Sequence, residues 1–87
     1  LESICTMLKK LAVRIYAMHL SGENVFYKED FSSPSAFMLG NEGNGLSESL
    51  TKLSDQLIRI PMLGQIESLN VATTASILMY EVYRQRQ

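Results

Sequence analysis

The sequence contains only one cysteine, Cys5, and one histidine, His19, so it can form neither an internal disulfide nor a tetrahedral zinc site from these residues. No apolar run approaches the roughly 18–20 residues that a membrane-spanning helix needs. The formal net charge of −1 gives no overall basic field that would attract nucleic acid. The clustered basic residues could contact phosphates or simply be solvated: Lys9, Lys10, Arg14, Arg84 and Arg86. We therefore expect no metal and no membrane among the partners of this chain.

The length and composition of the chain limit its architecture. The 87 residues allow one domain, and 46% hydrophobic with 20% charged residues is typical of a globular protein. A chain of this size buries only about 60–65% of the surface that its unfolded form exposes, so its core is small. The sequence begins at Leu1 with neither a signal peptide nor a tag ahead of it, and we expect a fragment of a longer cytoplasmic protein.

The spacing of apolar residues predicts short strands that alternate with helices. The expected strands cover residues 12–20, 35–39 and 56–60. The expected helices cover residues 1–11, residues 46–53 and a long stretch from 68 or 69 to about 84. Residues 25–34 should form a surface connection that Phe31 fixes to the core. This order predicts an α/β fold in which a parallel sheet carries helices on both faces.

The last expected helix is unusual because nearly all of its surface is apolar. Aliphatic and aromatic residues continue from Leu69 to Tyr83 and leave little polar surface. A helix of this kind is buried on more than one side. It is therefore either a central core helix or a helix that missing sequence or a partner subunit covers.

Two loops that contain glycine follow expected strands and precede expected helices. The first runs from Gly40 to Gly45 with the spacing G-x-x-G-x-G, which is neither a dinucleotide fingerprint nor a Walker A loop. The second covers residues 61–67 around Gly64. Glycine lets the backbone approach a ligand closely, although a tight turn without a ligand would use the same residues. Because ligands of open α/β sheets bind at the carboxyl ends of strands, the two loops outline a pocket.

Three polar side chains accompany the backbone amides of this expected pocket. Glu42 lies between the glycines of the first loop, where it is either a fixed acceptor for a substrate hydroxyl or an arginine, or a solvent-exposed carboxylate. Ser68 either acts on the substrate or caps the last helix. Asn70 lies in the first turn of that helix and completes the set.

Two longer motifs include these loops. Residues 37–47 read Phe-Met-Leu-Gly-Asn-Glu-Gly-Asn-Gly-Leu-Ser, and residues 60–81 contain Ile-Pro-Met, Glu-Ser-Leu-Asn-Val-Ala and Ile-Leu-Met-Tyr-Glu. In the same order and at the same separation, they resemble motifs 2 and 3 of the SpoU/TrmH-type RNA ribose 2′-O-methyltransferases of the SPOUT superfamily. Motif 1, which carries an arginine in that family, is missing here. The resemblance therefore makes residues 1–87 the C-terminal part of one methyltransferase domain.

The resemblance also implies a fold, a cofactor and partners. The fold would be an α/β-knot, in which the C-terminal segment threads through a loop to form a trefoil. S-adenosylmethionine (AdoMet) would bind in the knot, and the substrate would be a ribose 2′-hydroxyl of tRNA or rRNA. The protein would be a homodimer through its C-terminal helix. The implied cofactor contacts are Gly40, Ile60, Met62, Leu69 and Asn70, and the implied catalytic residues are Glu42, Ser68 and Asn70.

Three alternatives remain open beside this interpretation. The chain could be a catalytically incomplete module that binds AdoMet or RNA. It could belong to a SPOUT base methyltransferase, although Asn41-Glu42 and Ser68-Leu69-Asn70 resemble the ribose branch. It could also be a glycine-loop nucleotide-binding domain, which would bind ATP without AdoMet.

Overall fold

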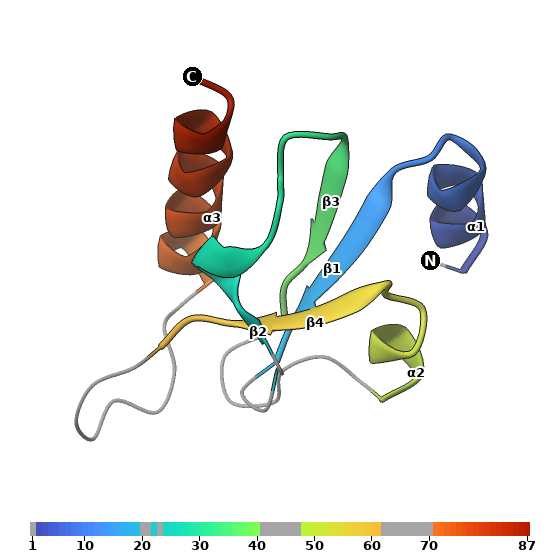
Figure 1. Cartoon of the computed structure of the whole chain (residues 1–87). Helices are drawn as coiled ribbons and strands as arrows, with labels where there is room; N and C mark the ends of the chain where they lie inside the picture. The colour runs from blue at the N-terminus through green and yellow to red at the C-terminus, as the bar shows by residue number, and fades with distance from the viewer. Residues whose placement is uncertain (1, 20–21, 23, 41–47, 62–70) are drawn as a thin grey trace.

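The computed structural model of the chain describes residues 2–19, 22, 24–40, 48–61 and 71–87 (Figure 1). In chain order its elements are α1 (Glu2–Lys10), β1 (Arg14–Met18), β2 (Asn24–Val25), a 3-10 helix (Phe26–Lys28), β3 (Ser35–Met38), α2 (Glu48–Thr51), β4 (Gln56–Arg59) and α3 (Val71–Gln85). Each strand and helix predicted from the sequence has its counterpart in this order.

The described strands form one parallel sheet in the order β2-β4-β1-β3. The central strand is β1, in which Ala17 lies opposite Met38 of β3 and Leu57 of β4. Three successive residues of β1 are buried, namely Ile15, Tyr16 and Ala17. Because successive side chains of a strand point to opposite faces, this strand is covered on both sides.

The edge strand β2 was not expected, so the prediction of a plain surface connection over residues 25–34 is partly wrong. β2 pairs with Ile58 and Arg59 of β4, and the 3-10 helix follows it directly. Two residues are too few to show the alternation that identifies a strand in a sequence. The other half of the prediction is confirmed, because Phe31 is fully buried.

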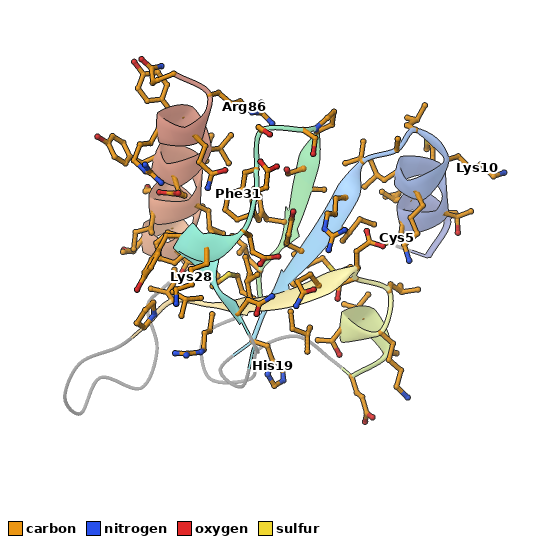
Figure 2. All side chains as sticks on the ribbon, viewed as in Figure 1. Cys5, Lys10, His19, Lys28, Phe31 and Arg86 are labelled. Atoms are coloured by element: carbon orange, nitrogen blue, oxygen red, sulfur yellow. The ribbon has the colours of Figure 1, made fainter. Side chains whose placement is uncertain are left out.

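One face of the sheet carries the main core. Its buried side chains are Tyr16, Phe31, Ile58 and Leu78. Figure 2 shows Phe31 between α3 and the strands. The ring of Phe31 packs edge-on against Tyr16 and Phe37, with centroids 4.9 Å and 5.1 Å apart. Burying each of these large side chains contributes about 1.5–3 kcal/mol, and Leu78 thereby attaches α3 to the sheet.

The opposite face of the sheet lies against α1. Ile15 and Ala17 alternate with Tyr16 and therefore point away from the main core. Cys5 of α1 is buried as a small apolar residue. Figure 1 shows α1 and α3 on opposite sides of the strands. The predicted parallel sheet with helices on both faces is confirmed.

A tight turn joins α1 to β1. The Val13 N–H donates to the Leu8 carbonyl at 2.9 Å, and the Ala12 N–H donates to the Lys9 carbonyl at 3.1 Å. These two bonds form a Schellman motif, in which Ala12 has a φ of 61°. Glycine is the usual residue at this position because a Cβ is strained in the left-handed region.

The last helix, α3, is covered on one side only. Its buried residues are Thr74, Leu78 and Glu81. On the other side, Met79, Tyr80 and Tyr83 are 69%, 67% and 62% exposed. The alternative of a central core helix is therefore wrong for this chain, because the chain itself supplies cover for a single face.

Candidate active site

The candidate site lies at the carboxyl ends of the parallel strands. Gly40 follows β3 and Ile60 follows β4, and both residues are half-buried. In the sheet, β1 separates these two strands, so the segments after β3 and β4 leave the same edge on opposite sides of β1. A position at which connections leave in opposite directions is where open α/β sheets bind ligands.

The other predicted site residues lie outside the described residues. They are Glu42 in the first loop, together with Met62, Ser68, Leu69 and Asn70 in the second. The structure thus brings Gly40 and Ile60 to one edge of the sheet, and the roles of the whole set stay predictions. The described start of α3 is Val71, directly after Asn70 in the sequence.

The turn after β1 contributes a third part of this edge. The His19 N–H donates to the Ile58 carbonyl at 2.9 Å, and the Gly22 N–H donates to the His19 carbonyl at 3.0 Å. Gly22 is buried against β4, where a Cβ would lie 2.7 Å from the carbonyl carbon of Ile58. Only glycine permits this close approach, which holds the turn against the strand that leads to Ile60.

The ionisable side chains of β1 have structural environments. His19 is exposed at the end of the strand (Figure 2). Burial raises the pKa of Tyr16, and its protonated hydroxyl donates to the Asp30 carbonyl at 3.2 Å. The Arg14 guanidinium lies 5.6 Å from the centroid of the Tyr16 ring. Within the described ranges, no group of three or more acidic, His or Cys residues could hold a metal, and no helix could cross a membrane.

Two of the basic residues make intramolecular bonds at the far end of α3. Arg84 donates to the Glu81 carboxylate at 2.9 Å and 2.6 Å. Arg86, at the C-terminal end of the helix in Figure 2, donates to the carbonyls of Phe31 and Ser33, at 3.0 Å each. These contacts support a structural use of both arginines rather than phosphate binding.

The sequence interpretation missed Gln85, whose side chain joins this cluster. The available signal was the placement of Glu81, Arg84 and Gln85 at i, i+3 and i+4, since side chains at these spacings meet on one helix face. The pattern does not reveal the contact with the segment around Phe31, because that contact joins residues 54 positions apart.

Comparison with known proteins identifies the class to which this fold and motif pair belong. The model of the SpoU rRNA Methylase family matches residues 1–80. The chain belongs to this family, and the resemblance seen in the two motifs is confirmed. The parallel sheet therefore has the fold of the SpoU rRNA Methylase family.

The relatives include the tRNA (guanosine(18)-2′-O)-methyltransferase of Escherichia coli K12. The two proteins are 40% identical over 81 residues, which are 92% of this chain and 35% of the relative. The chain therefore spans about a third of the length of this curated relative.

Solved structures agree with this assignment. The Aquifex aeolicus TrmH/SpoU tRNA modifying enzyme matches 97% of this chain and 43% of its own, with a TM-score of 0.86 and 36% identity. The SpoU methyltransferase AviRb from Streptomyces viridochromogenes, in complex with the cofactor AdoMet, matches 97% of this chain and 34% of its own. Its TM-score is 0.87 and its identity 29%.

Proposed function

We propose that this chain is the cofactor-binding, C-terminal part of an AdoMet-dependent RNA methyltransferase. The reaction is transfer of a methyl group to a ribose 2′-hydroxyl of tRNA or rRNA. The observation that carries the proposal is the placement of Gly40 and Ile60, one residue from each family motif, at the carboxyl ends of β3 and β4 on either side of β1. Membership of the SpoU family supports the same reaction.

The edge fits the uncharged adenosyl part of the cofactor. The ladder pairs of β3 and β4 extend to Met38 and Arg59, so the backbone groups of Gly40 and Ile60 lie just beyond them. Main-chain donors and acceptors of this kind can bind an adenosyl group without a charged side chain. We assign AdoMet contacts to Gly40, Ile60, Met62, Leu69 and Asn70, in an α/β-knot of the family type.

The polar residues of the site act on the ribose hydroxyl. Bound AdoMet supplies a methyl group that its sulfonium already activates. The task of Ser68 and Asn70 is to position and polarise the 2′-hydroxyl in line with the methyl–sulfur bond, and Glu42 orients the substrate. The family's motif 1 arginine, which activates the hydroxyl, has no counterpart in these 87 residues. Arg14 is not a substitute, because it starts β1 at the amino edge of the sheet.

A second copy of the chain is the proposed cover for α3. The exposed side chains of Met79, Tyr80 and Tyr83 form an apolar surface on one helix, which supports a homodimer through this C-terminal helix. RNA is the proposed substrate, and a cytoplasmic location agrees with it.

Calorimetric titration with AdoMet tests the cofactor proposal, in the natural full-length protein and in this 87-residue chain. Binding to both is expected if the pocket is complete here, and binding to the full-length protein alone would show that the pocket needs further sequence. Absence of binding to either would refute the cofactor assignment. Binding without methyl transfer to RNA would favour an incomplete binding module, and a methylated base in the digested RNA would favour a base methyltransferase.

A further inference from the structure

A hydrogen-bonded cluster occupies the last turns of α3. Glu81 is only 6% exposed, and its carboxylate accepts bonds from Arg84 and, at 2.7 Å, from Nε2 of Gln85. These bonds, those from Arg84 above all, hold the pKa of Glu81 below its ordinary value of 4.5. The carboxylate is therefore charged at neutral pH, and a charged acceptor fixes the orientation of the Gln85 amide.

The Gln85 amide bonds to the main chain of the segment that precedes β3. Its Oε1 accepts the Phe31 N–H at 2.6 Å, and its Nε2 donates to the Glu29 carbonyl at 2.9 Å. In a parallel sheet, one residue donates its N–H to a carbonyl of the neighbouring strand and accepts the N–H two residues further on. The Gln85 amide makes the same pair of bonds, to the Glu29 carbonyl and the Phe31 N–H. The side chain thus satisfies two polar groups of a segment that has no strand or helix of its own.

Arg86 extends the contact along the same segment. Its Nε donates to the Phe31 carbonyl and its Nη2 to the Ser33 carbonyl, both at 3.0 Å. The aromatic ring of Phe31 is meanwhile buried in the core. Four directional bonds from Gln85 and Arg86 therefore join the end of α3 to the main chain over residues 29–33.

This junction connects two elements that each adjoin, in the sequence, a residue assigned to the cofactor: Gly40 after β3 and Asn70 before α3. The segment over residues 29–33 leads into β3, which ends just before Gly40, and α3 begins at Val71, after the second loop. From Val71 to Gln85 the helix extends about 21 Å. Apolar contacts such as those of Leu78 hold the helix against the sheet but are not directional. The bonds at its end are directional and therefore set its position along its axis and its rotation.

We propose that Gln85, oriented by Glu81, is a positioning residue for the AdoMet site at the opposite end of α3, an inference that rests on the proposed function. Without the Gln85 bonds, the start of α3 shifts relative to Gly40 and Ile60. AdoMet binding then weakens although every residue assigned to the cofactor is intact.

The test is calorimetric titration of AdoMet into variants of the natural full-length protein, at a temperature at which all of them are folded. Gln85→Ala should raise the Kd about tenfold, which corresponds to ~1.4 kcal/mol. Gln85→Glu should also raise it, because the near-isosteric carboxylate keeps the acceptor for Phe31 but loses both donated bonds and repels Glu81. Gln87→Ala removes the same side chain from an exposed position two residues away and should leave the Kd unchanged.

Ile15→Val separates positioning from stability, because Ile15 is buried on the α1 face of the sheet. It should lower the melting temperature without changing the Kd. If Gln85→Ala lowers the melting temperature but keeps the affinity of the unsubstituted protein, the positioning role is refuted and Gln85 is merely structural. Wild-type affinity in Gln85→Glu would likewise refute it, since packing alone would then suffice. If the unsubstituted protein binds no AdoMet, the proposed function itself fails and the positioning role with it.

Discussion

Replacement of Gly22 by alanine tests the account of the turn that supports the site. The added Cβ would lie 2.7 Å and 2.8 Å from the carbonyl carbon and oxygen of Ile58, and 3.1 Å from the Arg59 nitrogen. All three atoms belong to the backbone of β4, which pairs with β1 on one side and with β2 on the other. The strand therefore cannot move away without breaking ladder bonds, and the turn has to move instead.

The magnitude follows from two opposing effects. Overpacking of a well-packed site costs about 1–3 kcal/mol. Alanine also restricts the conformations of the unfolded chain, which raises the free energy of unfolding by about 0.4–1 kcal/mol. With the central values of both effects, the net loss in the free energy of unfolding is about 1.3 kcal/mol. That loss lowers the Tm of a domain of this size by about 5–10 °C. AdoMet affinity should fall as well, because the displaced turn contacts the end of β4 just before Ile60.

The assay is thermal unfolding followed by circular dichroism, with AdoMet titration of the folded variant. Ala12→Gly is the reciprocal control, because Ala12 is exposed and has a φ of 61°. That exchange relieves left-handed strain and should leave the Tm unchanged or slightly higher. A Gly22→Ala protein with an unchanged or raised Tm would refute the steric argument. A lowered Tm with unchanged AdoMet affinity would separate the turn from the site.

Three further predictions concern the reaction, the assembly and the pH dependence of stability. Asn70→Ala should lower methyl transfer from labelled AdoMet at least about tenfold, and unchanged turnover would remove Asn70 from the active centre. Tyr83→Glu should dissociate the proposed homodimer in sedimentation velocity, whereas a monomeric unsubstituted protein would contradict the proposed assembly. Because the folded state lowers the pKa of Glu81, its stabilising contribution is present above its ordinary value of 4.5 and is lost as the pH falls below it. In urea unfolding between about pH 3 and pH 6, the free energy of unfolding should fall less steeply with falling pH in Glu81→Gln than in the unsubstituted protein. Equal pH dependences in the two proteins would disprove the linkage.

The sequence predicted those features that depend on local pattern. The apolar run over β1 identified a strand buried on both faces, because a parallel strand covered on two sides has no polar alternation. The isolated aromatic Phe31 identified the point at which a connection enters the core. Two motifs, read as resemblances, also led to the family that comparison then confirmed.

Other features could not be read from any local pattern. β2 forms because its two residues pair with β4, and a strand of two residues is too short to show an alternating pattern in the sequence. The requirement for glycine at position 22 arises from the backbone of β4, which is distant in the sequence. The sequence pattern also does not predict that one side of α3 is exposed, because an apolar helix has the same pattern whether one face or two are covered.

The sequence by itself thus determined the order of the longer elements, the α/β class and the family, because periodicity and short motifs are properties of neighbouring residues. Only the tertiary structure decided which distant groups meet. It brought Gly40 and Ile60 to one sheet edge and joined Gln85 to the main chain of Glu29 and Phe31. Such contacts depend on the order of strands and on the axial position of a helix, which the packing of the whole chain sets.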